Sequence, residues 1–348
     1  MKPLRHKIRP SRIAIVDPCS VAGYDLPDLE TGGLGGTEAT VLRVATALEP
    51  QFDVTLYQHG RTNRHMSKAG LLRSLEALCP ASGHDAIVVI NRWKVALKLR
   101  KQHADIPIFL WLHVYPGRHN RKMGAALKSA DITVICVSNT HAKKLGDFLG
   151  VKDAPEIRVI YNPLGDNLHP DDTLRNPNRL FFASSPHKGL AEVFDRFAVL
   201  RQSLPELTLA IADPGYLKWD TGPVPDGVVF LGSLSHAALI RHMRRALCLF
   251  YPQTSFAETF GLVLAEANAV GTPVLVHAGL GANSEIVADA GQQVDGRDPA
   301  QILKRIQTWR RALPQVTANP DFRLSKVAQQ WAQLLQRATT TQPQISMV

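Results

Sequence analysis

The chain has 348 residues, of which 45% are hydrophobic and 20% charged, and it carries a formal net charge of +10. A chain of this length exceeds the size at which one hydrophobic core usually stops growing, so we expect two domains of about 150 to 180 residues with a cleft between them. The composition excludes extensive disorder, and no apolar run reaches the ~20 residues of a membrane-spanning helix. The apolar stretch behind the basic N-terminal residues is too short for a signal peptide, so we expect a cytoplasmic protein.

Short apolar stretches rich in Val and Ile recur through the first half of the chain. They are residues 12–17, 52–59, 85–91, 106–113 and 132–138. Each is followed by a segment long enough for a helix or a loop. Continuous apolar runs of this kind are typical of parallel strands that are covered on both faces.

The second half repeats the pattern. Its apolar stretches are residues 178–185, 207–213, 228–233, 248–253 and 272–278. The sequence therefore predicts an α/β protein with two Rossmann-like, doubly wound parallel-sheet domains that face a cleft.

Residues 161–178, which contain three prolines and several Asn and Asp, are typical of a connector between the two halves. We place the domain boundary there, with residues 1–165 as the first domain and residues 166–348 as the second. An amphipathic helix is expected over residues 322–338. It can pack on the second domain or cross back to the first.

The stretch TGGLGGTEAT precedes an amphipathic helix near the start of the chain. Its glycines let the backbone approach a ligand closely, and the amides of Gly36, Thr37 and Glu38 would point outward at the helix N-terminus, where an anion is stabilised. This favours a phosphate cradle, although the stretch matches neither G-x-G-x-x-G nor a Walker A loop. A flexible turn is the alternative.

The segment ETFGLVLAEANAVGTPVL places Glu258 and Glu266 around a Phe-Gly pair. If a helix begins near Gly261, the amides of Phe260, Gly261 and Leu262 form a second anion site. Glu266 then lies about one and a half turns into the helix, among residues too apolar for a surface. A carboxylate there can accept two hydrogen bonds from the vicinal diol of a ribose, while the amides hold a diphosphate.

This segment resembles the retaining glycosyltransferases of the GT-B fold, in particular the large family 4, also called glycosyl transferases group 1. The resemblance rests on E-x7-E with F-G-L-x-x-x-E-A and G-T-P-V. It extends over nearly the whole chain through GGLGGTE, WLHVYPG, VSNTHAKKL, PHKGL and GLGANSEIV. The combination is far more specific than any single piece.

The resemblance implies a role for each matching residue. Lys188 would offset the diphosphate charge, Glu266 would bind the ribose, Glu258 would lie beside the donor sugar, and His113 would contact that sugar near its anomeric carbon. The expected catalytic residues are therefore His113, Lys188 and Glu258. The expected donor-binding residues are Gly35, Gly36, Lys188, Glu258, Thr259, Phe260, Gly261, Leu262 and Glu266.

One departure from the family pattern concerns the diphosphate. Members usually carry an arginine about five residues before the lysine, but Ala183 and two serines occupy this region. Either another base such as Arg118 or Arg245 takes the place of this arginine, or the charge of the diphosphate is neutralised less fully than is usual in the family.

The resemblance implies an enzyme that transfers a hexose with retained anomeric configuration, by same-face attack and without a protein nucleophile. The chain contains no D-x-D and no C-x-x-C. We therefore expect metal-independent activity and no cofactor, with fixed positive groups and helix ends in place of a divalent metal. The nucleotide sugar is a co-substrate, and family frequency favours UDP over GDP or ADP.

The distribution of charge bears on the acceptor. Residues 1–165 hold 23 of the 40 Lys and Arg but 14 of the 30 Asp and Glu. Residues 91–103 and 117–128 are basic stretches with apolar residues at helical spacing, which is typical of a solvated helix face or of a surface for anionic membranes. We expect a lipid acceptor, such as diacylglycerol or a lipid-linked glycan, and a bacterial enzyme of glycolipid synthesis peripheral to the cytoplasmic face of the inner membrane.

Several alternatives remain open. The acceptor can instead be soluble, or a polysaccharide or lipopolysaccharide precursor. A sugar-nucleotide epimerase, or a non-catalytic module that binds nucleotide sugars, would share the architecture. No motif that reads nucleic-acid bases is present, so we expect no nucleic-acid partner.

Overall fold

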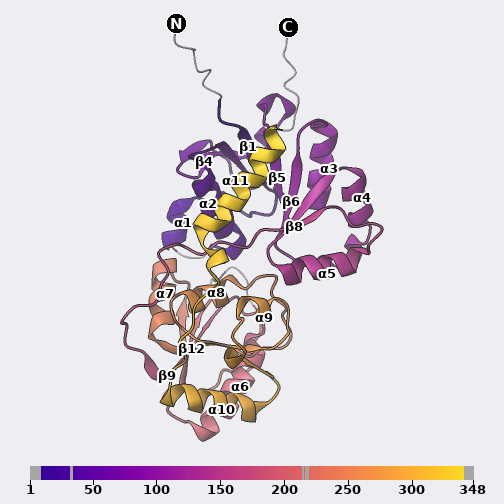
Figure 1. Ribbon diagram of the computed structural model, residues 1–348. Helices are drawn as coiled ribbons and strands as arrows, with labels where there is room; N and C mark the ends of the chain where they lie inside the picture. The colour runs from indigo at the N-terminus through magenta and orange to yellow at the C-terminus, as the bar shows by residue number, and fades with distance from the viewer. Residues whose placement is uncertain (1–8, 32–33, 214, 216–218, 341–348) are drawn as a thin grey trace, which may run out of the picture.

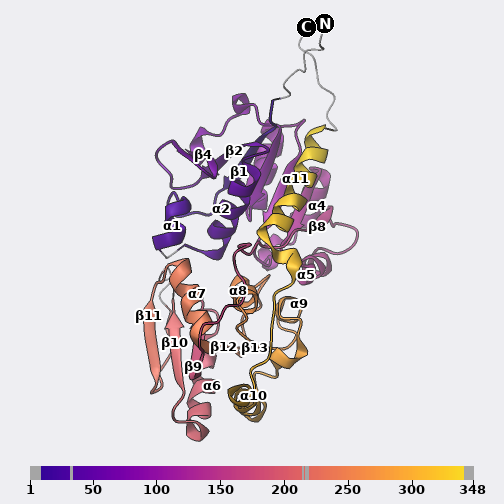
Figure 2. The same ribbon diagram turned by 60° about the vertical axis from the view of Figure 1, so that its left-hand side comes forward.

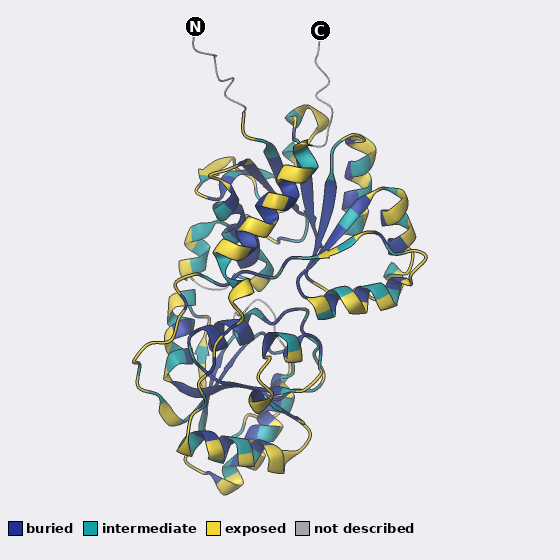
Figure 3. Cartoon of the chain, in the orientation of Figure 1, coloured by how far each residue is buried: buried dark blue, intermediate teal, exposed yellow. Residues whose placement is uncertain are grey.

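The computed structural model describes residues 9–31, 34–213, 215 and 219–340. The chain forms two domains, each with a mainly parallel sheet covered by helices (Figure 1). Their central strands are buried, and the exposed residues lie mainly on the outer faces of the helices, on loops and on edge strands such as residues 228–232 (Figure 3). The architecture confirms the predicted α/β fold class.

The first sheet has the strand order β3-β4-β2-β1-β5-β6-β7-β8. All its pairs are parallel except the β3–β4 hairpin. The strands are β1 Arg12–Asp17, β2 Asp53–Gln58, β3 His65–Ser67, β4 Gly70–Ser74, β5 Ala86–Ile90, β6 Ile108–Leu112, β7 Ile132–Cys136 and β8 Ile157–Val159. The helices are α1 Leu26–Thr31, α2 Gly36–Leu48, α3 Trp93–Gln102, α4 Met123–Ser129 and α5 Asn139–Leu149, with short 3-10 turns at Leu75–Ala77 (η1), Pro80–Ser82 (η2) and Arg118–Asn120 (η3).

The second sheet is parallel throughout, with the order β11-β10-β9-β12-β13-β14. Its strands are β9 Asn176–Ala183, β10 Thr208–Ala212, β11 Val228–Gly232, β12 Ala246–Tyr251, β13 Val274–His277 and β14 Gln293–Val294. Its helices are α6 Leu190–Ser203, α7 His236–Arg245, α8 Leu262–Ala269, α9 Asn283–Ile286 and α10 Pro299–Arg311, with 3-10 turns at Ala290–Gln292 (η4) and Pro320–Phe322 (η5).

In both sheets the strand order reverses once, between β1 and β5 and between β9 and β12. Ligands of open α/β sheets bind at the carboxyl ends of the strands beside such a reversal. Every predicted strand is present. The sequence did not predict β3, β4, β8 and β14, because they have only two to five residues each and too little apolar periodicity to stand out from loops.

The last helix, α11 Leu324–Thr340, returns to the first domain and lies along α2 and β5 (Figures 1 and 2). Its buried Trp331 packs against Trp111 of β6, with ring centroids 4.6 Å apart. The alternative of packing on the second domain is therefore wrong. The segment that leads back to the first domain runs beside the segment that leaves it. Leu164 of the leaving segment exchanges backbone hydrogen bonds with Phe322 and Leu324. The domain boundary proposed between residues 165 and 166 lies where these two connecting segments run side by side.

Candidate active site

Two adjoining cavities lie where the carboxyl ends of the two sheets face each other. The small cavity, of about 200 Å³, is lined from α2, β9, α7 and α8. The large cavity, of about 920 Å³, extends from it over the loop after β6 and the loop before α8. The residues that the sequence nominated as catalytic or donor-binding all line one or both cavities. They are Gly35, Gly36, His113, Lys188, Glu258, Thr259, Phe260, Gly261, Leu262 and Glu266.

The first helix start at the site belongs to α2. Gly35 is its N-cap, and a Cβ added to Gly35 would meet the carboxylate of Glu38, which folds back over the turn. A Cβ on Gly36 would lie 3.9 Å from Leu262 at the start of α8, so the two helix starts lie close together. Burial, together with the Asp17 carboxylate, raises the pKa of Glu38. Two further glycines of the loop, Gly32 and Gly33, lie outside the described residues.

The second helix start belongs to α8, one residue later than expected. Gly261 is the N-cap with φ of +85°, a conformation that L side chains rarely adopt. The first helical amides are therefore those of Leu262 and Val263, whereas the sequence nominated Phe260, Gly261 and Leu262. The Phe260 ring is buried and packs on Phe322, with centroids 5.0 Å apart.

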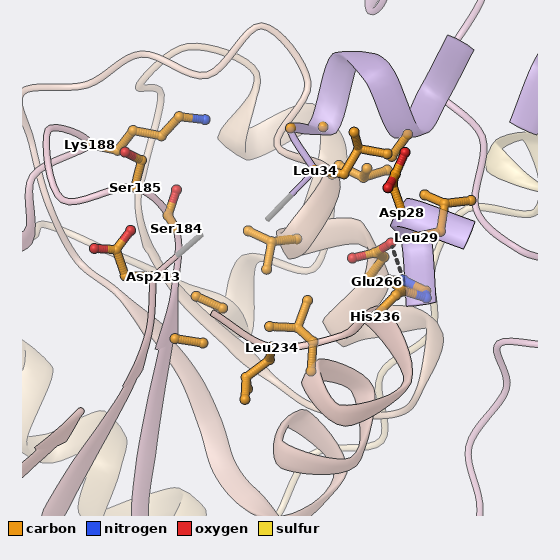
Figure 4. A pocket seen from close by; sticks show the side chains of 18 of the residues that line it. Asp28, Leu29, Leu34, Ser184, Ser185, Lys188, Asp213, Leu234, His236 and Glu266 are labelled. Atoms are coloured by element: carbon orange, nitrogen blue, oxygen red, sulfur yellow. Dashed lines mark hydrogen bonds and ion pairs between the residues drawn. The ribbon is translucent and has the colours of Figure 1, made fainter. Parts of the chain in front are cut away.

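Glu266 is buried in α8 and points into the small cavity beside His236 (Figure 4). Its Oε1 atom lies 2.8 Å from Nε2 of His236 and accepts from Arg43 Nη1 at 3.4 Å. Burial alone would raise the pKa of Glu266, but His236 and Arg43 outweigh it and hold that pKa below the ordinary value. Glu266 is therefore an ionised carboxylate at the cavity wall. No local sequence pattern indicates its two partners, because Arg43 and His236 lie 223 and 30 positions from Glu266 along the chain.

Glu258 and Lys188 form an ion pair between the two cavities. Nζ of Lys188 lies 3.0 Å from Oε1 and 3.2 Å from Oε2 of Glu258. The hydroxyl of Tyr251 donates a third hydrogen bond, 3.0 Å long, to Oε1. Lys188 also lies over the Phe256 ring, 4.9 Å from its centroid. The sequence assigned this lysine and this glutamate to separate parts of the donor, and the structure brings them into direct contact.

His113 follows β6 and lines the large cavity. Burial, with the nearby His141, lowers its pKa to about 3, so the imidazole is neutral at physiological pH. Its buried Nε2 atom has no hydrogen-bond partner among the described residues. A neutral imidazole with a vacant nitrogen can bind an uncharged hydroxyl, such as that of a sugar.

Several hydrogen bonds join the two domains around these residues. Thr259 donates from Oγ1 to the carbonyl of His113 at 2.8 Å, and Ser138 donates to the carbonyl of Thr259 at 2.6 Å. Glu285 of α9 accepts from the backbone amides of Asn139 and Thr140 at the N-terminus of α5. The loop that carries Glu258 is therefore fixed to the first domain as well as to its own sheet.

Arg118 and Arg245, the two examples of a base that could replace the missing family arginine, line neither cavity, so neither of them fills that place. Arg245 is the last residue of a ten-residue helix whose first residue, His236, lies at the small cavity. At ~1.5 Å per residue, the helix carries Arg245 roughly 14 Å away. Arg118 lies in η3, which Asn120 attaches to Trp93 of α3.

Among the residues that the structure describes, the lysines and arginines that line the two cavities are Lys188 and Arg43. Lys188 and the hydroxyls of Ser184 and Ser185 lie on one side of the small cavity, and Glu266 lies on the other (Figure 4).

Comparisons with known proteins agree with this geometry. Residues 177–311 match the family model described as glycosyl transferases group 1. The match lies within the second domain, and the whole chain has the GT-B fold. The group 1 segment contains Lys188, Glu258 and Glu266.

Two curated relatives match part of the chain. A D-inositol 3-phosphate glycosyltransferase from Nocardioides sp. is 40% identical over 105 residues, which is 30% of this chain and 20% of that protein. A phosphatidyl-myo-inositol mannosyltransferase from Mycobacterium tuberculosis is 34% identical over 93 residues, or 26% of this chain and 24% of that protein. The chain thus matches about a fifth to a quarter of the length of these relatives.

Two solved structures show how far the fold extends beyond the group 1 segment. Sucrose-phosphate synthase from Thermosynechococcus elongatus superposes with a TM-score of 0.72 at 18% identity, covering 95% of this chain and 100% of that one. AviGT4, a glycosyltransferase involved in avilamycin A biosynthesis, gives a TM-score of 0.60 at 18% identity over 96% and 99% of the two chains. These likenesses extend the GT-B fold over both domains.

Over the described parts of the chain, no group of three or more His, Cys, Asp or Glu could hold a metal ion. No helix within those parts is long and apolar enough to span a bilayer.

Proposed function

We propose that this chain is a glycosyltransferase that moves a hexose from a nucleotide sugar to a hydroxyl group of its acceptor, with retention of configuration. The observation that supports this most strongly is the convergence of Lys188, Glu258 and Glu266 with the start of α8 on one pair of cavities at the strand-order reversals of both sheets. The group 1 family match and the GT-B fold support the same activity.

The donor follows from the chemistry of the cavity walls. The ribose diol binds Glu266, whose contacts among the described residues all go to Oε1, so Oε2 remains to accept from the diol. The diphosphate lies between Lys188 and the amides at the start of α8. The hexose then extends into the large cavity, toward Glu258 and His113. A UDP sugar is the first donor to test.

The transfer proceeds by same-face attack. The bond between the anomeric carbon and the diphosphate oxygen breaks as the acceptor oxygen approaches the anomeric carbon from the same side. The acceptor proton passes to the departing phosphate oxygen. Lys188 and the α8 amides stabilise the charge that develops on the leaving group. We propose that no protein nucleophile takes part.

We propose that turnover needs no divalent metal and no cofactor, since a cation and helix amides already face the diphosphate position. The test is activity after treatment with a chelator. Full activity supports this part of the proposal, whereas loss of turnover that added Mg²⁺ or Mn²⁺ restores would contradict it.

For the acceptor we propose a membrane lipid that carries a free hydroxyl. The two basic stretches form neighbouring elements, because Trp93 of α3 donates to Asn120 of η3 and α3 contacts α4. Their exposed basic residues are Arg92, Lys94, Lys98, Lys101, Arg118, Arg121, Lys122 and Lys128. Such a surface binds anionic lipid headgroups. The name of the relative that acts on phosphatidyl-myo-inositol supports a lipid acceptor, and the protein would then be peripheral to the cytoplasmic membrane face.

A soluble acceptor is the second candidate, supported by the relative named for D-inositol 3-phosphate. Both candidates are tested by incubating the purified chain with a panel of sugar nucleotides and either a total lipid extract or soluble polyols and their phosphates. Mass spectrometry of the products identifies the acceptor. Release of free nucleotide without a glycosylated product would instead indicate a hydrolase, and conversion of the donor into an isomeric sugar nucleotide would indicate an epimerase.

A further inference from the structure

Tyr251, which the sequence did not nominate, is the last residue of β12 and is 1% exposed. Its ring stacks on Phe182 of the neighbouring strand β9, with centroids 5.7 Å apart and an interplanar angle of 24°. This packing fixes the position of the hydroxyl, which donates to Oε1 of Glu258 at 3.0 Å. A rigid buried ring thus holds a hydrogen-bond donor against the carboxylate.

The other hydrogen-bond donor to Glu258 is Lys188. Lys188 has a flexible stem, and its side chain is 24% exposed at the boundary of the two cavities. When a diphosphate binds, the ammonium group is drawn toward the phosphate charge. Tyr251 is then the donor that remains on Oε1.

Tyr251 also stays uncharged in this position. Burial, with the adjacent Glu258 carboxylate, raises the pKa of Tyr251 well above its ordinary value, so the hydroxyl keeps its proton. A neutral donor orients the carboxylate without neutralising it. The negative charge of Glu258 therefore remains available to the sugar.

We propose that Tyr251 is a positioning residue that keeps the Glu258 carboxylate pointed at the donor sugar while Lys188 serves the diphosphate. This inference rests on the proposed glycosyl transfer. It predicts that loss of the Tyr251 hydroxyl impairs the chemical step and leaves donor binding largely intact.

The variant Tyr251→Phe keeps the stacked ring and removes only the hydroxyl. A hydrogen bond to a charged group is worth about one to two powers of ten in an equilibrium or rate, so we expect kcat to fall about ten- to hundredfold while the donor KM changes less than about threefold. The matched control is Tyr57→Phe. Tyr57 is equally buried and bonds to His84 at 2.9 Å, away from both cavities. The control should keep wild-type kcat, with a similar loss of thermal stability.

Wild-type kcat in Tyr251→Phe would overturn the inference, provided that Glu258→Gln loses turnover, and the proposed function would stand. A second measurement does not depend on turnover. Crystal structures with UDP bound should show the Glu258 carboxylate in one orientation in the wild type and displaced toward Lys188 in Tyr251→Phe. An unchanged carboxylate in the variant would overturn the inference by itself. Absence of turnover in every protein, with UDP bound normally, would instead contradict the proposed function.

Discussion

Arg43 of the first domain reaches across the cleft to Glu266 of the second, with Nη1 3.4 Å from Oε1. The two side chains are 11% and 4% exposed, so the pair is screened from solvent. His236 contacts the same oxygen. A carboxylate assigned to the nucleotide is therefore also a contact between domains, which links the donor site to the relative position of the two sheets.

Removal of this contact should destabilise the protein. In Arg43→Ala, Glu266 keeps His236 but loses its arginine, and leaving a buried charge partly unpaired costs on the order of 2–4 kcal/mol. Urea denaturation measures the loss. The control Lys143→Ala breaks an exposed pair with Asp147 and should change the free energy of unfolding by less than about 0.5 kcal/mol. Equal effects of the two variants would contradict a structural role for Arg43.

Substitution of Glu266 and substitution of Glu258 should impair different properties of the enzyme, nucleotide affinity in the first case and kcat in the second. Glu266→Gln should weaken nucleotide binding about ten- to hundredfold, because the amide presents a single acceptor oxygen to the diol. Glu258→Gln should instead lower kcat with little effect on nucleotide affinity. Calorimetric titration with UDP, together with steady-state kinetics, separates these outcomes. Identical losses of affinity in both variants would show that the two residues do not divide the donor between ribose and hexose.

Gly261 should not tolerate a side chain. Its φ of +85° is strained for alanine, and the added Cβ would lie 2.8 Å from Cδ1 of Leu264. We expect Gly261→Ala to cost about 1–3 kcal/mol and to weaken UDP binding, since the start of α8 must shift. Gly222→Ala is the control, because its φ is +70° but no atom lies within 4 Å of the new Cβ. A variant at Gly261 that binds UDP normally would argue against an anion site at this helix start.

Three buried histidines should make the protein sensitive to acid. Burial lowers the pKa of His84 and His141 to about 4 and that of His113 to about 3, from an ordinary value of 6.5. Below pH 6.5 the unfolded chain takes up protons that the folded chain refuses. The free energy of unfolding therefore keeps its full value above pH 6.5 and decreases toward pH 4. The decrease at pH 5 is about 2 kcal/mol for each histidine.

Urea midpoints at pH 7.5 and pH 5.0 measure this loss. His84→Gln should reduce the difference between the two values, whereas the exposed His169→Gln should leave it unchanged. A midpoint that does not move between these pH values would contradict the expected neutral state of the buried imidazoles.

The basic surface of the first domain should mediate any attachment to membranes. Replacing Lys94, Lys98 and Lys101 of α3 by Glu should reduce sedimentation with phosphatidylserine vesicles at least tenfold at low salt, because each basic residue near the surface contributes about 1 kcal/mol. The same charge change at the exposed Lys304, Arg311 and Lys326 should have little effect. Binding that persists undiminished at 1 M salt would exclude an electrostatic attachment.

The repeating apolar strands were sufficient to predict two doubly wound sheets, because parallel strands buried on both faces have a distinctive composition. Glu258, Glu266 of α8 and Lys188 were found through local motifs. Arg43, His236 and Tyr251 were not, because each joins the site through a contact between residues at least seven positions apart that no local pattern records. Arg118 and Arg245 were nominated by charge alone, and charge does not specify which face of a helix a residue occupies.

The sequence allowed two positions for α11, against the second domain or back against the first. Its apolar face shows that the helix must be buried, but not against which domain. The deciding contact, between Trp331 and Trp111, joins residues that are 220 positions apart.

The most direct test of the account is a crystal structure of the chain with UDP bound. We predict the ribose hydroxyls on Glu266, and the diphosphate between Lys188 and the amides of Leu262 and Val263. A nucleotide bound elsewhere, or bound between the domains with its ribose away from Glu266, would contradict the proposed donor site.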